Sequence, residues 1–166
     1  MTRLLGRALT PELLERFSQK ALGSRLGIAI PFVTVDGDGR PHPMLLSYLE
    51  LRAYSPTTLG LVIQTPSHSA RNLAERGTGT LLVLEPDVVV YVKTRVVDGP
   101  LPVEDADDLR LGYFLLEVEE VLQDAAAEWE GAVRITSAVR YEPSPSLGER
   151  WATVTRRALE APRARA

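Results

Sequence analysis

The stretch Thr65-Pro66-Ser67-His68-Ser69-Ala70-Arg71-Asn72-Leu73 follows an apolar run from Leu59 to Ile63 and precedes a glycine at position 77. An apolar run that ends in Thr-Pro-Ser predicts a strand followed by a turn and a short helix. Ser67 is the expected N-cap, because its hydroxyl can accept a hydrogen bond from a backbone N–H of the first turn. Gly77 is the expected end of the helix, since glycine adopts the left-handed conformation that terminates helices.

The start of this helix is a candidate anion site. The N–H groups of His68, Ser69 and Ala70 have no partner inside the helix and lie at the positive end of its dipole. Arg71 follows Ser67 by four residues, so its guanidinium can reach a phosphate bound at the same face. The alternative is a capped connecting helix with a solvated arginine, because serine N-caps are common. The face that packs on the sheet is expected to consist of Ala70, Leu73 and Ala74.

Two strands joined by a tight turn are predicted upstream of this segment. The first runs from Arg25 to Asp36 and the second from Pro43 to Leu51, with the turn Asp36-Gly37-Asp38-Gly39 between them. The glycines supply the positive φ that tight hairpin turns require. The turn lacks the twelve-residue calcium-binding pattern that ends in glutamate, so we interpret it as a plain turn. Pro31 cannot donate a ladder hydrogen bond, which predicts an edge strand or a bulge.

Further strands are expected downstream, at Leu81–Glu85, Val88–Val97, Tyr113–Leu122 and Val133–Glu142. The second of these alternates clearly, with valines on one face and Tyr91, Lys93 and Arg95 on the other. The charged face is expected to be solvated. The acidic segment from Asp98 to Leu109 is expected to be a crossover with one short helix.

Two longer helices are predicted near the ends of the chain. Residues Thr10 to Leu22 carry an apolar stripe at helical spacing, with Thr10 as the cap, Pro11 in the first turn and Gly23 as the end. A C-terminal helix is expected at about residues 145–160, with Ser144 as its cap. A helical turn is also expected from Asp124 to Gly131.

Composition sets limits on structure and function. A chain of 166 residues fits a single domain covering residues 1–166. The net charge of −3 gives no electrostatic basis for nucleic-acid binding. The absence of cysteine excludes disulfides and thiolate metal sites, and two histidines make a histidine-rich metal site unexpected. No run of apolar residues has the length of a membrane span, and no signal-peptide pattern opens the chain. We therefore expect a cytoplasmic protein.

Together these patterns resemble the FMN-binding split-barrel family, the pyridoxamine 5′-phosphate oxidase-like proteins. The resemblance covers roughly residues 25–142 and rests on the Asp-Gly hairpin, on the Ser-x-x-Ala-Arg-Asn-Leu segment from Ser67 to Leu73, and on the strand pair after it. It implies a mainly β fold: a six- to seven-stranded antiparallel split barrel of Greek-key type with peripheral helices. It also implies a homodimer in which both subunits build each flavin site, and the Tyr91 face could then line the groove between them.

The resemblance also implies where FMN would bind. The Ser-led segment would hold the phosphate, and the middle of the Pro43–Leu51 strand would line the flavin ring. The implied cofactor-binding residues are Met44, Leu45, Leu46, Ser47, Thr65, Ser67, His68, Ser69, Arg71 and Asn72. The family commonly has an Arg-Lys pair directly after the serine, where this chain has His68 and Ser69.

The expected function is that of an FMN-dependent oxidoreductase acting on a small substrate. The oxidases proper carry an arginine and a histidine near the C-terminus that hold the substrate phosphate, whereas no histidine follows His68 here. We therefore do not expect a true pyridoxamine phosphate oxidase. No catalytic residue is assigned, although His68 is a candidate proton donor or phosphate contact. The alternatives are a non-enzymatic protein that binds flavin, deazaflavin F420 or haem, and a dimer that binds no ligand.

Overall fold

The computed structural model describes residues 2–86, 88–125, 134–142 and 149–165. Its elements in chain order are β1 (Thr2–Gly6), α1 (Pro11–Phe17), α2 (Leu22–Arg25), β2 (Ala29–Val35), β3 (Pro41–Ser47), the 3₁₀ turn η1 (Tyr48–Glu50), β4 (Leu51–Ser55), β5 (Thr58–Gln64), α3 (His68–Arg76), β6 (Thr78–Glu85), β7 (Val88–Pro102), β8 (Leu111–Asp124) and α4 (Glu149–Ala158). The prediction of a mainly β fold with peripheral helices is confirmed.

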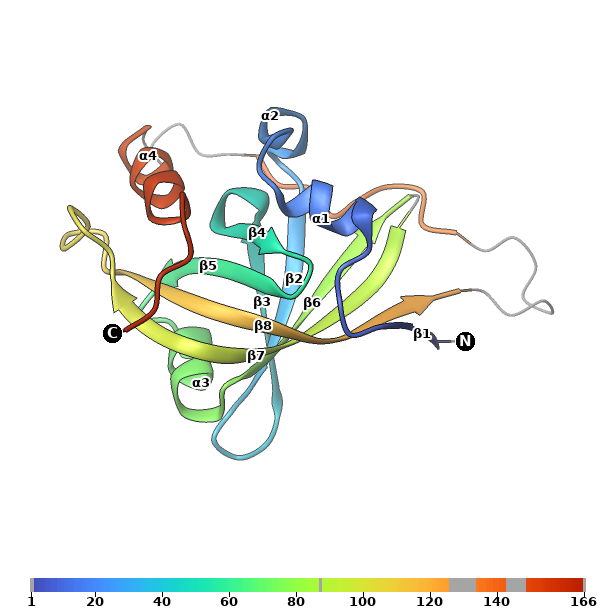
Figure 1. Cartoon of the computed structure of the whole chain (residues 1–166), viewed down its shortest axis with the longest axis horizontal. Coiled ribbons are helices and arrows are strands. Elements are labelled where there is room, and N and C mark those ends of the chain that lie inside the picture. The colour runs from blue at the N-terminus through green and yellow to red at the C-terminus, as the bar shows by residue number, and fades with distance from the viewer. Residues whose placement is uncertain (1, 87, 126–133, 143–148, 166) are drawn as a thin grey trace.

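The strands form one eight-stranded antiparallel sheet that curls into a barrel (Figure 1). The order is β3-β2-β6-β7-β8-β5-β4, with β1 beside β8. Strands β3 and β4 stand at the two ends of this order and follow one another in the chain through η1. No strand pairing joins these two among the described strands, so the barrel is split along this line.

The barrel interior is filled by the inward-facing side chains of successive strands. Phe32, Leu81, Val92 and Phe114 are fully buried in one cluster. Helix α1 closes one end of the barrel with Leu13 and Phe17, and α3 closes the other end with Ala70 and Leu73. Burying a side chain of this size contributes about 1.5–3 kcal/mol. The core therefore stabilises the fold. Because its side chains fill the barrel interior, a ligand has to bind outside the barrel.

The N-terminal helix is shorter than predicted. Helix α1 ends at Phe17, not at Leu22, because Gln19 adopts a positive φ of 65°. The side-chain amide of Gln19 donates hydrogen bonds to the backbone oxygens of Leu49 and Leu51, each at 3.1 Å. These bonds hold residues 18–21, the joint between α1 and α2, against η1, and they compensate for the interruption of the helix. Gly23, the predicted end, lies inside the separate helix α2.

Three strand predictions need correction. The first strand begins at Ala29, not at Arg25, which belongs to α2. The strand predicted for 43–51 is interrupted by η1. The residues described within 133–142 form no strand and make one isolated bridge, between Ile28 and Arg140. The expected crossover from Asp98 is still strand up to Pro102, and residues 103–110, between β7 and β8, contain no helix.

Pro31 does not mark an edge, because β2 lies between β3 and β6. The backbone N–H of Ala29 donates to Val139 on the side away from β3, at 2.8 Å. Alternate residues of a strand direct their N–H groups to the same side. Pro31 therefore lacks a backbone N–H on the side of β2 away from β3. On that side β2 pairs with β6 only at Phe32 and Val33, so Pro31 lies beyond the paired stretch.

Helix α4 packs on the outside of β5 and β8. Val154, Ala158 and Leu159 form a second buried cluster with Val62 and Tyr113. The segment after α4 then crosses the sheet, and the backbone N–H of Arg163 donates to the Tyr113 hydroxyl at 3.2 Å. The predicted cap at Ser144 and most of the predicted turn at 124–131 lie outside the described residues. No described helix is long and apolar enough to cross a membrane.

A buried charged cluster joins α1 and α2 to the barrel. Glu85 accepts hydrogen bonds from Arg16 Nη1 at 2.7 Å, from Arg25 Nη1 at 3.2 Å and from the Tyr48 hydroxyl. Arg25 also lies over the Tyr48 ring, 5.3 Å from its centroid. Burial, reinforced by the Glu85 carboxylate, raises the pKa of Tyr48 well above its usual value. The tyrosine is therefore a hydrogen-bond donor to Glu85.

Candidate functional site

The turn from β5 into α3 is held by short local hydrogen bonds. The Thr65 backbone N–H and hydroxyl both donate to the Arg110 carbonyl, at 2.8 and 3.1 Å. The Ser67 hydroxyl donates to the Gln64 carbonyl at 2.7 Å and accepts from the Ala70 N–H at 3.1 Å. Ser67 is therefore the N-cap, as predicted. The helix ends at Gly77 in the left-handed conformation, which is also as predicted.

The first turn of α3 keeps donors that the helix does not use. The N–H groups of His68 and Ser69 precede the first helical hydrogen bonds, and the described residues supply them with no acceptor. The Arg71 side chain is exposed and makes no hydrogen bond or ion pair within the described parts of the chain. The turn therefore combines two N–H donors, the helix dipole and one cation.

A second histidine lies beside this turn. The His42 ring on β3 is 5.4 Å from the exposed His68 ring, centroid to centroid. His42 Nδ1 lies 3.5 Å from an Asp36 carboxylate oxygen at the end of β2. Sequence reasoning did not place His42 in the site, because the contact joins positions that are far apart in the chain. The only available signal was that the chain has two histidines. Within the described residues, no group of three such side chains is arranged as metal ligands.

Asn72 and Ser69 face the protein. Asn72 is buried, and its amide donates to the Thr34 hydroxyl at 3.0 Å and to Asp36 at 2.8 Å. These bonds attach α3 to the β2–β3 hairpin. Ser69 is only 2% exposed, whereas Ala74, expected to pack on the sheet, is exposed. The buried face of α3 is thus Ser69, Ala70, Asn72 and Leu73.

The predicted residues on β3 point in different directions. Leu46 is buried in the barrel and Met44 packs against the same core, whereas Leu45 points outward and is 61% exposed. The Ser47 backbone N–H and hydroxyl both donate to Glu50, at 2.7 and 2.9 Å. Burial raises the pKa of Glu50 above its ordinary value, against the lowering effect of these two bonds.

The structure therefore brings His68, Arg71 and His42 together around the start of α3. Ser47 lies five residues beyond His42, roughly 16 Å along an extended strand. The predicted phosphate end and the predicted ring end are thus separate regions of the surface. Any ligand that contacts both must extend along β3.

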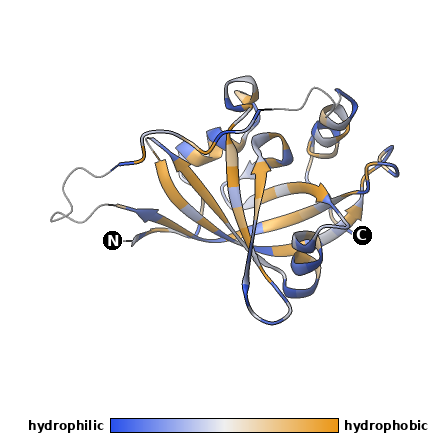
Figure 2. Ribbon diagram, turned by 180° about the vertical axis from the view of Figure 1, so that it is seen from behind, coloured by the Kyte–Doolittle hydropathy of each residue, from blue (hydrophilic) through white to orange (hydrophobic). Residues whose placement is uncertain are grey.

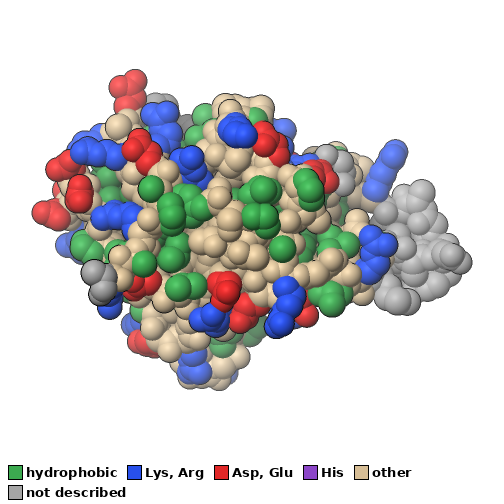
Figure 3. All heavy atoms as spheres, in the orientation of Figure 1, with side chains coloured by type: hydrophobic (Ala, Val, Ile, Leu, Met, Phe, Trp, Pro, Cys, Tyr) green, Lys and Arg blue, Asp and Glu red, His purple; other side chains and the backbone are tan. Residues whose placement is uncertain are grey.

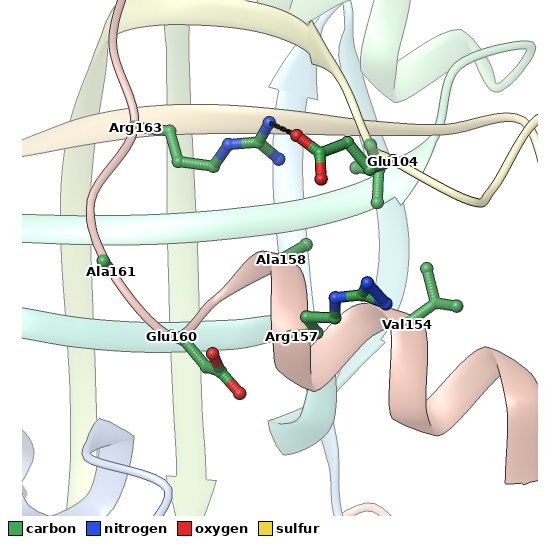
Figure 4. Close-up of a pocket in the computed structure, with 8 residues that line it drawn as sticks. Glu104, Val154, Arg157, Ala158, Glu160, Ala161 and Arg163 are labelled. Atoms are coloured by element: carbon green, nitrogen blue, oxygen red, sulfur yellow. Dashed lines mark ion pairs between the residues drawn. The ribbon is translucent and has the colours of Figure 1, made fainter.

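Two hollows on the surface lie away from these residues. The smaller one, of about 240 Å³, lies between α4, the segment after it and the residues that follow β7. Figure 4 shows Arg163 and Glu104 pointing toward one another across it, 4.0 Å apart, while Arg157 projects from α4. The larger one, of about 540 Å³, lies on the other side of the α4 end. Neither of these two hollows includes a predicted flavin contact.

Three solved structures share this fold. The first is a proposed pyridoxamine 5′-phosphate oxidase from Lactobacillus delbrueckii, 19% identical, with a TM-score of 0.55 over 73% of this chain and 98% of that one. The second is an FMN-binding protein from Syntrophomonas wolfei, 18% identical, with a TM-score of 0.53 over 70% and 88%. The third is an FMN-binding domain of a flavin reductase-like enzyme from Shewanella baltica, 11% identical, with a TM-score of 0.50 over 75% and 78%.

No protein-family model matches the sequence, and no curated protein sequence matches it either. The structural likeness confirms the predicted split-barrel fold, which holds even at these low identities.

Proposed function

We propose that this chain is a flavoprotein that binds the FMN phosphate at the start of α3. The observation that carries the proposal is the open first turn of this helix, where the N–H groups of His68 and Ser69 precede Arg71, whose exposed side chain has no partner among the described residues. A phosphate accepts hydrogen bonds from both kinds of donor, and the helix dipole favours its charge. The same turn contains no carboxylate that would repel it.

The residues present fit a phosphate better than the sequence alone suggested. The chain lacks the Arg-Lys pair after the serine, but the His42 ring lies next to the His68 ring, and an imidazole N–H can donate a hydrogen bond to a phosphate. The flavin ring would then extend along β3, where Leu45 presents an exposed side chain and the backbone offers polar groups. The similarity in fold to FMN-binding structures supports this assignment.

The proposed activity is that of an FMN-dependent oxidoreductase on a small substrate. Bound flavin would supply hydride chemistry, while the protein supplies binding and orientation. In this chain Arg71 and the α3 N–H groups would fix the phosphate, and the exposed His68 ring would lie beside it. Pyridoxamine 5′-phosphate is not the expected substrate, because both histidines of the chain lie at or before the start of α3. The cytoplasm remains the expected location.

We further propose that the protein is a homodimer formed through the outer face of the sheet. The strand register places Leu4, Leu122, Tyr91 and Leu82 in one row across four strands, and Pro31 and Leu45 form a cross-strand pair on the same outer side of β2 and β3. Leu4 and Leu45 are 59% and 61% exposed. Figure 2 shows that the strands of the sheet consist largely of hydrophobic residues. A row of partly exposed apolar side chains across neighbouring strands supports an interface on this face.

The free edge of β3 is poorly suited to pairing with a strand of a second subunit, which favours a dimer formed through the face of the sheet. Because the even-numbered residues of β3 bond to β2, its odd-numbered residues direct their N–H groups to the free edge. Pro41 and Pro43 have no N–H, and the Ser47 N–H is bonded to Glu50. Three of the four outward donors are therefore missing or occupied.

The proposal is tested by replacing Arg71 with alanine and titrating FMN and riboflavin. A charge-assisted contact is worth roughly 1.5–3 kcal/mol, so Arg71→Ala should weaken FMN binding by about ten- to a hundredfold. Riboflavin lacks the phosphate and should bind as before. Equal losses for the two ligands would contradict the phosphate assignment.

A gain-of-function variant completes the test. His68 is the position for it, because its side chain is exposed whereas Ser69 is buried. His68→Lys should tighten FMN binding at pH 8 and leave riboflavin unchanged. Absorbance spectra of the protein with each ligand would separate a flavin protein from one that binds F420 or haem. Oxidation of reduced nicotinamide by the FMN-loaded protein would separate an enzyme from a carrier.

A further inference from the structure

The hollow of about 540 Å³ carries an unusual concentration of positive charge. It lies between the joint of α1 and α2, strand β4 and the C-terminal half of α4. Four basic side chains line it, Lys20, Arg52, Arg156 and Arg157, against the single carboxylate of Glu160. The whole chain has a net charge of −3, so the remainder is more acidic than average. Figure 3 shows Lys and Arg side chains interspersed with Asp and Glu around α4, in the upper left of the view.

The walls of this hollow are fixed by the fold. The Gln19 side chain holds the α1–α2 joint to the start of β4 through the Leu49 and Leu51 carbonyls. Arg52 Nη1 donates to the Leu159 carbonyl at 3.2 Å, and its guanidinium lies 6.0 Å from the centre of the Tyr54 ring. The backbone that carries the charges is therefore set before any ligand binds.

The charges themselves remain available to a ligand. Arg156 is exposed and has no hydrogen bond or ion pair within the part of the chain that the structure describes. Lys20 is 3.7 Å from Glu15, and both side chains are well exposed, so this pair exchanges readily with solvent. Arg157 also lines the hollow, but both of its terminal nitrogens lie 3.1 Å from one Asp105 carboxylate oxygen, so its charge is already paired.

We propose that this hollow binds a small molecule that carries two or more phosphate groups. Guanidinium groups match phosphate oxygens through paired hydrogen bonds, and those of Arg52 and Arg156 line one space here together with the ammonium group of Lys20. The volume lies within the usual range for small-molecule sites. A single phosphate would engage only part of the charge, whereas linked phosphates would reach both α4 and the α1–α2 joint. The site is separate from the start of α3 and does not depend on flavin binding.

Calorimetric titration of the full chain with inorganic pyrophosphate at low salt tests the proposal. We expect saturable binding of one pyrophosphate per chain, stronger than that of orthophosphate. Arg156→Gln should weaken it by about tenfold or more, because a charge-assisted contact is lost. Lys20→Gln should weaken it in the same direction. Glu160→Gln should tighten binding, a result that misfolding cannot produce.

Arg40→Gln is the matched control. It removes one exposed arginine at the β2–β3 turn, which Figure 1 places at the opposite end of the molecule from α1 and α2. The control should bind pyrophosphate as the unaltered protein does. The proposal is overturned if binding does not saturate, if Arg40→Gln and Arg156→Gln lose equally, or if Glu160→Gln has no effect. It is also overturned if the loss occurs with Arg71→Ala in place of Arg156→Gln, since pyrophosphate would then occupy the start of α3.

Discussion

Glu85 is a single carboxylate on which three elements depend. It ends β6 inside the molecule and accepts hydrogen bonds from Arg16 of α1, Arg25 of α2 and Tyr48 of η1. Arg16 and Glu85 are both largely buried. A buried ion pair contributes little net stability when complete, but removing one partner leaves the other charge buried without compensation. The cluster therefore makes the docking of the N-terminal helices sensitive to one side chain.

Glu85→Gln should lower the free energy of unfolding by about 3 kcal/mol, because Arg16 and Arg25 lose their ion pairs with Glu85 while Arg16 keeps its pair with Glu12. Urea denaturation followed by circular dichroism measures the change. Glu75→Gln is the control: Glu75 is exposed on α3, and its replacement should stay within about 0.5 kcal/mol. A loss for Glu85→Gln no larger than the control would show that the cluster does not hold the helices.

At the scale of elements, the short turn η1 decides how the barrel is split. It carries the chain from β3 to β4, and Glu50 caps it by accepting from the Ser47 N–H and hydroxyl. The burial of Glu50 raises its pKa in the folded state. The folded protein therefore binds this proton more readily than the unfolded chain, so the stability linked to Glu50 falls as pH rises through the window above 4.5.

A comparison of the unaltered protein with Glu50→Gln isolates this effect from the other carboxylates. Between pH 7 and pH 4.5 the unaltered protein should gain stability relative to the variant, and the difference should be flat above the window. Thermal unfolding at intervals of half a pH unit provides the measurement. If the unaltered protein instead loses stability relative to the variant as the pH falls, the two Ser47 hydrogen bonds outweigh burial in setting the pKa of Glu50.

The elements that sequence patterns predicted best are those with local signals. Helix α3 was predicted at both ends because Ser67 and Gly77 fix it without reference to the rest of the chain. The segment around Ile135 and Val139 alternates like a strand, yet both side chains are exposed. Alternation shows that a residue could face a core, but not that a neighbouring strand is present. The early end of α1 likewise depends on Gln19 reaching η1, thirty residues away.

The same distinction applies to the candidate site. Its helical half follows from Ser67 to Arg71, and the structure retains that turn with its donors free. The approach of His42 could not be predicted, because it requires the β2–β3 hairpin to lie against α3. Nor could the burial of Ser69 and Asn72, which follows from how α3 is rotated on the barrel.

At the scale of the whole molecule, the outer sheet face predicts a dimer. Sedimentation at micromolar concentration should give a species of about twice 18.2 kDa. Leu45→Asp should shift it toward the monomer, because a carboxylate would be buried in the apolar contact. Leu26→Asp, at an exposed leucine between α2 and β2, should leave the dimer intact. A protein that sediments as a monomer at these concentrations would contradict both the interface and the shared site.

The Glu85 cluster also imposes an order on synthesis. Arg16 and Glu85 are 69 residues apart in the chain. At a translation rate of about 5–20 residues per second, Glu85 is made roughly 3–14 s after Arg16. Until then, Arg16 has only the i,i+4 partner Glu12 within its own helix and not the buried Glu85, and Phe17 lacks the barrel end that covers it. The first helix to leave the ribosome must therefore wait in water for strand β6, and it docks only when more than half of the chain has been made.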